Sequence, residues 1–439
     1  MFIRFFGRRE TRYVLMAILS IYMFLLAWKN YSIWNDEWFT LNAVSQSWEG
    51  MWNILADDLV HPPLYYVLLK LFLDLFHLSH LNAILFAKLF SVIWVILLFV
   101  WGSKLIERRF GAIPALLFVA LLSGNMAVCY SVEIRMYSIA MCFTTLAYLY
   151  AGELVSNPDT KKWCLFFVCS LIGAYTNYFS IIALSLIWIW LLIRKWKCSD
   201  RYCWWICFGL MTLLYIPWII TFISHAKSVT DYNVPLSLRR IISFFAFPFS
   251  CHNRYISIIT IVVAAMLSAY IMFVKRDEFA EIGVFSFLWV GVACIISSVA
   301  FDKFFIGRYL LPALGVLCAG IAVGTRNLRY RNSILFVICI VDVMALFFIA
   351  EVESSDRKYM DNLIRDTESM DEQIFAEKDV LKILRYCVPS TNAEIMPSDL
   401  RKGSYFVYFW SDEYFQVKDF EQKQIYDFSE RRIDLYEVR

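Results

Sequence analysis

Long apolar runs separated by short polar segments are the feature that most restricts the fold of this chain. A membrane-spanning helix needs about 20 mostly apolar residues, and eleven runs approach that length. They are residues 13–31, 83–104, 112–130, 137–154, 163–176, 178–193, 203–222, 255–274, 281–300, 307–324 and 333–350. Hydrophobic residues make up 60% of the 439 residues, and the mean hydropathy is +0.58. The sequence therefore predicts an all-α polytopic membrane protein with about 11 transmembrane helices.

The basic residues indicate how these helices are oriented. The segment 61–78 is apolar but short, and its Lys70 and Asp74 would be costly at the centre of a bilayer. If this segment does not span and the N-terminus is cytoplasmic, nearly every basic cluster falls inside, as the positive-inside rule requires. The clusters are residues 4–12, 108–109, 161–162, 194–201, 275–276 and 326–331. We expect 61–78 to lie on the outer surface or to be re-entrant, and the C-terminal segment to be outside. The basic head and the apolar run 13–28 predict an uncleaved signal anchor.

A pair of acids, Asp36 and Glu37, follows the first apolar run in the stretch WNDEWF. Apolar residues then recur at helical spacing, which predicts one amphipathic helix in the membrane interface. These residues are Trp38, Leu41, Val44, Trp48 and Met51. In one interpretation Asn35 or Asp36 caps this helix and Glu37 favours its first turn. In the other, the acid pair takes part in chemistry. Of the 38 acids, 20 lie after residue 350, so the first 350 residues are poor in acids and an acid there invites a functional question.

The stretch HPPLYY, which begins at His61, predicts a corner between a loop and a helix. Pro62 or Pro63 can open the helix, and the proline after His61 favours an extended conformation at that histidine. The corner is either purely structural, or it directs His61, Tyr65 or Tyr66 toward a cavity beside the acid pair.

The stretch YSVEIRMYS places Glu133 and Arg135 between two apolar runs with almost no room for a loop. Both residues are therefore expected at the outer membrane boundary, with Glu133 and Tyr137 on one helical face. One interpretation is a structural ion pair of Arg135 with Glu133 or with Asp36. The other is a guanidinium fork that binds a phosphate.

The stretch KFFIGRYLLP carries two basic residues at the outer end of an apolar run. One interpretation of Lys303 is a snorkelling anchor. Arg308, beside Tyr309, lies flush against the apolar run and is harder to explain in this way. Taken together, these outer motifs suit a substrate with a lipid tail, a phosphate and a polar head. The loop 223–254 contains no spacing typical of a metal site, and the chain has no CxxC pair.

The order of these motifs resembles that of bacterial membrane glycosyltransferases with the GT-C fold. An acid pair after the first span is followed by HPPLYY, EIRMY, YTNYF and GRYLLP, over about residues 10–325. The chain is similar to the protein O-mannosyltransferase group and to the rhizobial core galacturonosyltransferases, including the aminoarabinose transferases of lipid A. Each motif alone is weak, but five in one order are fairly specific. Asn177 in YTNYF departs from the histidine that relatives often have.

The resemblance implies that a sugar moves, with inversion, from a polyprenyl-phosphate donor to a glycan, lipid or protein acceptor on the outer side of the membrane. It implies that Asp36 is the catalytic base, with Glu37 as its partner in the acid pair. The candidate residues for binding the donor phosphate or substrate are His61, Tyr65, Glu133, Arg135, Tyr137, Lys303, Arg308 and Tyr309. No cofactor is required, although a divalent cation is compatible with this chemistry.

Residues 351–439 are charged, with apolar alternation in two stretches and a helical pattern near 374–386. They predict a small α/β domain outside the membrane, which either recognises the acceptor or covers the active site. We therefore divide the chain into a transmembrane domain, 1–350, and a soluble extracytoplasmic domain, 351–439. The expected location is the bacterial cytoplasmic membrane, with the lipid bilayer as a partner and no nucleic acid.

A transporter or flippase of a lipid-linked sugar is the main alternative function. It predicts charges deep in several spans and an internal repeat, whereas the charges lie mainly at the outer ends and no clear repeat is present. A non-catalytic assembly subunit would not need the concentrated acid and arginine motifs.

Overall fold

The structure is a computed structural model that describes residues 9–58, 61–78, 80–225, 237–301, 306–397, 402–408, 420–428 and 432–438. Each predicted apolar run corresponds to a helix. These are α2 (Arg9–Ala27), α6 (His80–Leu97), α8 (Ala112–Ser123), α10 (Tyr137–Ser156), α11 (Thr160–Thr176), α12 (Tyr178–Lys195), α13 (Arg201–His225), α15 (Arg254–Tyr270), α16 (Glu278–Phe301), α17 (Leu311–Gly324) and α18 (Arg331–Glu368). Within the described ranges, nine helical segments are long and apolar enough to cross a membrane. The prediction of a multi-pass, mostly α-helical membrane protein is confirmed.

Shorter elements complete the bundle. Two π-helical segments, η1 (Leu98–Gly102) and η3 (Ile271–Lys275), extend α6 and α15, and α7 (Ser103–Phe110) follows η1 without a break. The remaining short helices are α9 (Met126–Cys129), α14 (Leu238–Ala246), η2 (Phe247–Phe249) and η4 (Gly307–Leu310).

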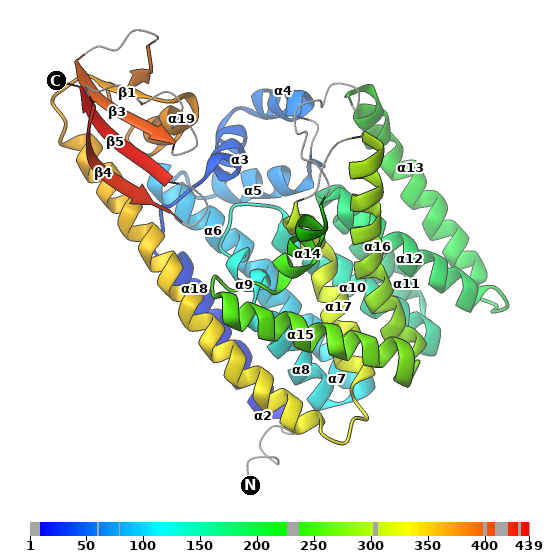
Figure 1. Ribbon diagram of the computed structural model, residues 1–439. Helices are drawn as coiled ribbons and strands as arrows, with labels where there is room; N and C mark the ends of the chain where they lie inside the picture. The colour runs from blue at the N-terminus through cyan, green and yellow to red at the C-terminus, as the bar shows by residue number, and fades with distance from the viewer. Residues whose placement is uncertain are drawn as a thin grey trace.

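Ion pairs gather the predicted cytoplasmic clusters at one end of the bundle, which we call the basic end. Arg12 of α2 pairs with Glu107 of α7 at 2.7 Å. Arg326, just after α17, pairs with Asp277 at 2.8 Å, and its guanidinium lies over the ring of Phe110 in α7. Helices far apart in the sequence therefore bring their basic termini together, as the positive-inside rule predicts. In Figure 1 this end carries α7 and the start of α2.

The opposite end, which we call the site end, carries α3 (Asn35–Ser45), α4 (Trp48–Asp58) and α5 (Leu64–Asp74) (Figure 1). The sequence predicted one helix through residue 51, and this was wrong: the chain breaks at residues 46–47, where the Ser47 side chain accepts a hydrogen bond from Gly50 N–H. A serine that bonds the backbone in this way favours a helix start. Pro63 stands at the N-cap of α5, as expected. At 11 residues, α5 is about 17 Å long, too short to cross a core about 30 Å thick.

Two buried helices, α10 and α17, form the centre of the bundle and fix the geometry of the site end. The apolar stretches that contain them are Tyr137–Ser156 and Gly307–Gly324, and 89% of each is buried. Thr145 of α10 would clash with a Cβ added at Gly315 of α17, at 2.2 Å, so the two helices approach closely. Close packing of this kind is rigid. The residues that immediately precede these two helices are therefore held in fixed relative positions.

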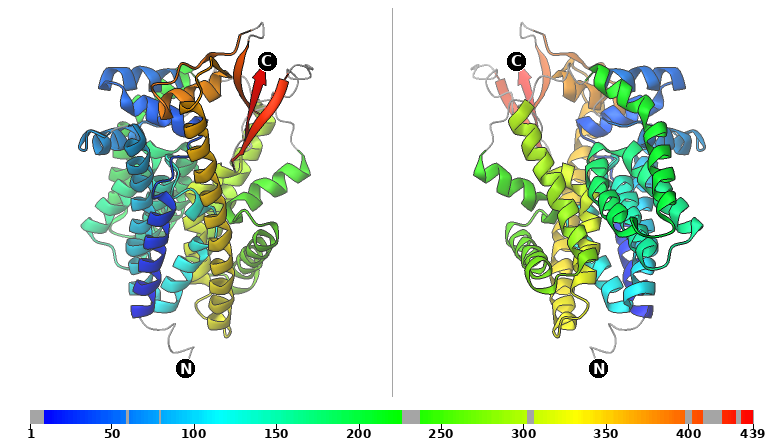
Figure 2. Two further views of the ribbon diagram at one scale, coloured as in Figure 1. Left: turned by 90° about the vertical axis from the view of Figure 1, so that its left-hand side faces the viewer. Right: turned by 90° about the vertical axis from the view of Figure 1, so that its right-hand side faces the viewer.

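The C-terminal region consists of α18 and a small α/β unit. At 38 residues, α18 is about 57 Å long, so it exceeds the bilayer thickness and runs from the basic end to the sheet (Figure 2). The five strands are β1 (Ile374–Ala376), β2 (Glu394–Ile395), β3 (Gly403–Tyr408), β4 (Phe420–Asp427) and β5 (Arg432–Val438). Their order is β2-β1-β3-β5-β4, with β1 parallel to both neighbours and β5 antiparallel to both of its own.

The helix of this unit, α19 (Lys378–Cys387), follows β1. The expected α/β domain is confirmed, but the helical pattern predicted from residue 374 was wrong for its first three residues, which form β1. The predicted domain boundary at residue 350 falls within α18.

Candidate active site

The start of α3 is anchored by Glu37 rather than by either expected cap. The N-cap is Trp34, so the prediction that Asn35 or Asp36 caps the helix was wrong. Glu37 Oε2 accepts a hydrogen bond from Trp34 N–H at 3.2 Å, and Oε1 accepts one from Ile134 N–H at 2.8 Å. Glu37 is only 2% exposed. A buried carboxylate with backbone donors on both oxygens ties two segments together firmly.

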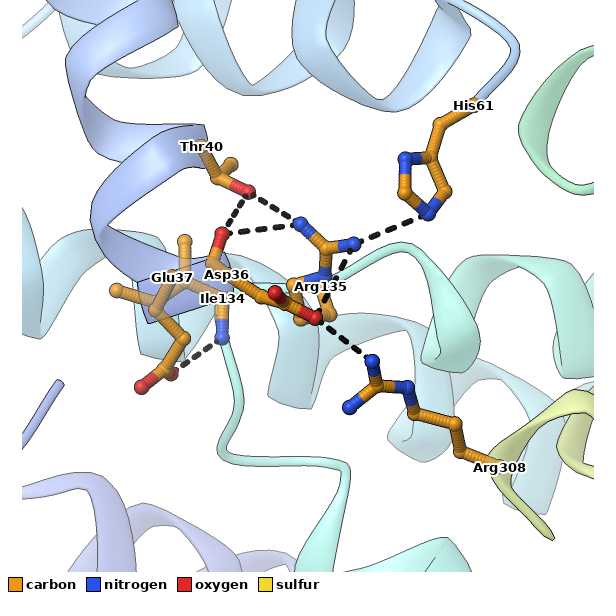
Figure 3. A network of polar contacts seen from close by, with 7 residues as sticks. All are labelled: Asp36, Glu37, Thr40, His61, Ile134, Arg135 and Arg308. Carbon is orange, nitrogen blue, oxygen red and sulfur yellow. Dashed lines mark hydrogen bonds and ion pairs between the residues drawn. The ribbon is translucent and has the colours of Figure 1, made fainter. Parts of the chain in front are cut away.

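Asp36 lies between two guanidinium groups (Figure 3). Its Oδ2 atom is 3.0 Å from Arg308 Nη2 and 3.7 Å from Arg135 Nη2. The Asp36 side chain is 30% exposed, whereas those of Arg135 and Arg308 are 2% and 19% exposed. Residues that are 99 and 272 positions from Asp36 thus meet at a single carboxylate. The alternative of an Arg135–Asp36 ion pair, raised from the sequence, is present in the structure.

Arg135 is locked in place by its hydrogen bonds. Its Nη1 donates to the backbone oxygen of Asp36 at 2.9 Å and to Thr40 Oγ1 at 3.2 Å. Its Nη2 lies 3.1 Å from His61 Nε2. Since a guanidinium only donates, His61 Nε2 accepts, which requires the neutral ring with its proton on Nδ1. The corner at HPPLYY therefore places His61 against Arg135, which in turn contacts Asp36 (Figure 3).

The segment that carries Arg135 is not helical. Residues 131–136 form turns and bends, and α10 begins at Tyr137. The prediction that Glu133 and Tyr137 share a helical face was therefore wrong. Because the backbone is irregular here, Ile134 N–H is free to donate to Glu37. In a continuous helix the same N–H would donate to a backbone carbonyl of the helix.

Arg308 retains unused hydrogen-bonding capacity. Its guanidinium lies over the Trp34 ring, 4.9 Å from the centroid, and its Nε is buried with no hydrogen-bond partner among the described residues. An unsatisfied buried donor costs about 1–3 kcal/mol, and more when it is charged. The preceding Gly307 lets η4 pack closely against η2, because a Cβ at Gly307 would lie 2.3 Å from the Cβ of Phe247. The Arg308 guanidinium therefore has a donor that Asp36 does not satisfy.

The predicted tyrosines stand behind the charged groups. Tyr65 is buried and shares a hydrogen bond of 3.1 Å with Ser91. Burial raises the pKa of its phenol, despite the opposing effect of the Ser91 bond, so Tyr65 stays protonated. Tyr137 packs edge-on against Tyr130, and Tyr309 stacks on Phe179 with centroids 4.3 Å apart.

Glu133 does not line the cavity at Asp36. It lines a small polar pocket together with Glu37 and the buried Lys88. Lys303, the remaining candidate from the sequence, lies outside the described residues.

A cavity of about 240 Å³ opens onto the carboxylate of Asp36. Its lining residues are Asn35, Asp36, Trp38, Phe39, His61, Arg135, Asp379 and Lys382. The last two come from α19, and sequence reasoning missed them. The only signal for them was the helical pattern near 374–386, which carries no motif that points to the acid pair.

Among the described residues, we find no cluster of side chains typical of a metal site. Across these ranges, no group of three or more His, Cys, Asp or Glu side chains is arranged to hold a metal ion. The donors around Asp36 are arginines and one histidine already bonded to Arg135, a set that suits an anion better than a cation.

Comparison with known proteins identifies related folds. Residues 60–221 match the family model described as dolichyl-phosphate-mannose-protein mannosyltransferase. The chain is similar to the crystal structure of ArnT from Cupriavidus metallidurans bound to undecaprenyl phosphate, with a TM-score of 0.60 and 10% identity, covering 98% of this chain and 99% of that one. The apo structure of the same protein gives a TM-score of 0.60 and 10% identity over 97% of each chain. No curated protein matches the sequence.

These matches confirm the expected resemblance to the GT-C membrane glycosyltransferases. At 10% identity, the structural likeness extends over nearly the whole of both chains and concerns the fold. The family model covers HPPLYY, the segment with Arg135 and YTNYF, but neither Asp36 nor Arg308.

Proposed function

We propose that this protein is a membrane glycosyltransferase that moves a sugar from a polyprenyl-phosphate donor to a glycan, lipid or protein acceptor. The observation that carries the proposal is the placement of Asp36 between Arg135 and Arg308 at the edge of a cavity. The matching family model is that of mannosyltransferases that use a lipid phosphate, and the related crystal structure holds undecaprenyl phosphate. The name of the family and the lipid in the crystal structure both involve a polyprenyl phosphate, the carrier part of the proposed donor.

The two arginines provide the positive charge that the leaving phosphate needs. One carboxylate neutralises one guanidinium, so a positive charge remains beside Asp36. A guanidinium matches phosphate oxygens in geometry, and Arg135 and Arg308 both lie beside Asp36. Negative charge grows on the phosphate as its bond to the sugar breaks, so preorganised donors here stabilise the transition state more than the ground state.

Asp36 acts as the general base. Its carboxylate takes the proton from an acceptor hydroxyl while that oxygen forms a bond to the anomeric carbon. The bond between the anomeric carbon and the lipid phosphate breaks at the same time, and the electron pair leaves with the phosphate. Attack opposite the leaving group inverts the anomeric centre. Glu37, as partner in the acid pair, holds the start of α3 so that Asp36 keeps its position.

We propose that the reaction takes place on the outer side of a bacterial cytoplasmic membrane. Support comes from the separation of the site end from the basic end, since basic clusters favour the cytoplasm. A phosphatase domain fused after residue 439 tests this orientation. We expect it to be active, and an active cytoplasmic reporter at the same position would contradict the proposed side.

Transport of a lipid-linked sugar is less well supported. A transport path needs polar groups through the bilayer, and the ion pairs among the described parts of the bundle lie at its two ends. Asp342 lies within α18, but it is buried and accepts a hydrogen bond from Ser123.

The test is to incubate the purified protein with a panel of polyprenyl-phosphate sugars, in the presence of a mixture of envelope glycans and lipids as acceptors, and to measure which donor is consumed. We expect one or a few donors to release the lipid phosphate, and Asp36→Asn to stop that release. Transfer to a mixture of envelope glycans and lipids then identifies the acceptor class. If no donor in the panel is bound or consumed, the proposed function is wrong.

A further inference from the structure

The C-terminal unit supplies one wall of the cavity at Asp36. Asp379 and Lys382 stand one turn apart on α19 and face α3. Lys382 Nζ lies over the Trp38 ring, 5.1 Å from its centroid. Figure 1 shows α19 between α3 and the sheet. Residues more than 300 positions apart in the sequence thus enclose the same space.

The opposite face of α19 is fixed in the protein core. The buried residues on that face are Val380, Leu381, Ile383, Leu384 and Cys387. Because this apolar face anchors the helix, its polar face is presented to the cavity by a rigid element. Rigid elements position binding groups more accurately than loops do.

The polar contacts of Asp379 and Lys382 are too weak to be the reason the unit docks. The two side chains are paired at 2.7 Å, with 45% and 34% of their surfaces exposed. A pair at this spacing on an exposed helix face contributes about 0.2–0.5 kcal/mol. Their donors and acceptors can therefore be transferred to a ligand at little cost.

The size of the cavity suits a single sugar ring. Its volume is about 240 Å³, which corresponds to roughly eight water molecules at about 30 Å³ each. This is below the range of about 300–1,000 Å³ typical of pockets for drug-sized ligands. The walls combine two aromatic rings, Trp38 and Phe39, with charged and amide groups. Sugar hydroxyls both donate and accept hydrogen bonds, as a carboxylate next to an ammonium requires.

We propose that Asp379 and Lys382 bind the sugar of the polyprenyl-phosphate donor and determine which sugar is accepted. This inference rests on the proposed function. In the donor, the sugar is attached directly to the phosphate. A phosphate held at Arg135 and Arg308 therefore places the ring in the adjoining cavity, whose far wall is α19. The C-terminal unit then recognises the donor sugar, in addition to forming one wall of the cavity.

The experiment measures the affinity of the full-length purified protein for two lipids. One is undecaprenyl phosphate, and the other is the same lipid carrying the sugar that the wild type consumes. The variants are Asp379→Asn and Lys382→Gln. Lys378→Gln is the matched control for Lys382→Gln. It removes the same positive charge from the same helix, but at an exposed residue that does not line the cavity.

We expect each cavity variant to weaken binding of the sugar-bearing lipid by about tenfold, the usual result of losing one hydrogen bond to a charged group. Binding of undecaprenyl phosphate should change by less than about twofold, because this lipid carries no sugar for Asp379 and Lys382 to contact. The variants should also consume a different ranking of donors from the panel. The Lys378→Gln control should behave like the wild type in all three measurements.

Three results would overturn the inference. The first is an unchanged ratio of affinities for the two lipids in both cavity variants. The second is an equal loss for both lipids, which would show general damage to the phosphate site. The third is the same loss in Lys378→Gln. Failure of the proposed function looks different, since the wild type would then bind neither lipid and consume no donor.

Discussion

The two ends of the bundle use the same charged residue types in opposite ways. At the basic end, Arg12 and Arg326 each have a carboxylate of their own, Glu107 and Asp277. At the site end, Arg135 and Arg308 share the single carboxylate of Asp36. One-to-one pairing neutralises each of these structural cations, whereas two guanidinium groups that share one carboxylate leave one positive charge uncompensated by it. This difference is what the proposed function requires, because the phosphate of the donor needs positive charge at the site end and not at the basic end.

The largest effect is expected from Asp36→Asn. General-base catalysis contributes about 10²–10⁴ to a rate, so we expect donor consumption to fall by about three orders of magnitude. The protein should still insert in the membrane and bind undecaprenyl phosphate, because both guanidinium groups remain. Initial rates and lipid affinity of the purified variant check this. Turnover equal to the wild type would remove Asp36 from the mechanism.

Arg308→Gln should reduce turnover by about 10²–10³, the usual cost of losing one preorganised donor at a developing charge. Its effect should fall on kcat more than on KM, since the phosphate charge grows in the transition state. Arg308→Lys keeps the charge but loses the planar fork, and should recover only part of the rate. Equal rates for Gln, Lys and Arg at this position would show that Arg308 does not touch the phosphate.

Glu37→Gln tests a residue with a positioning role. The amide has one acceptor oxygen for two backbone donors, Trp34 N–H and Ile134 N–H. We expect the free energy of unfolding to fall by about 1–3 kcal/mol, seen as a lower Tm in detergent. Turnover should fall in proportion to any displacement of Asp36. An unchanged Tm would contradict the anchoring role of Glu37.

Arg326→Gln, at the basic end, should have the smallest effect. Its partner Asp277 and its own side chain are 17% and 25% exposed, and partly exposed ion pairs contribute about 0–1 kcal/mol. Turnover should stay within about threefold of the wild type. A loss as large as that of Arg308→Gln would erase the distinction between the two ends.

Much of the arrangement is predictable from charge and periodicity. The alternation of apolar runs and basic clusters predicted the bundle and the short α5, because burial and charge bias act on segments whose length is readable in the sequence. The association of Asp36, His61, Arg135 and Arg308 followed from their shared position at the outer ends of helices.

The remaining features depend on local or long-range contacts. The break after α3 is decided by the Ser47 side chain, and the irregular backbone before Tyr137 by a bond from Ile134 N–H to Glu37. Neither contact alters the apolar pattern. Asp379 and Lys382 reach the cavity only because α18 carries the C-terminal unit back over α3 (Figure 2). Such pairing has no signature in a single sequence.

The most direct test of the shared-carboxylate site is an experimental structure of this protein with undecaprenyl phosphate. We predict that the phosphate lies within hydrogen-bonding distance of Arg308 and Arg135, beside Asp36, with the cavity under α19 left free for a sugar. A phosphate bound elsewhere, with both arginines still paired only to Asp36, would contradict the account.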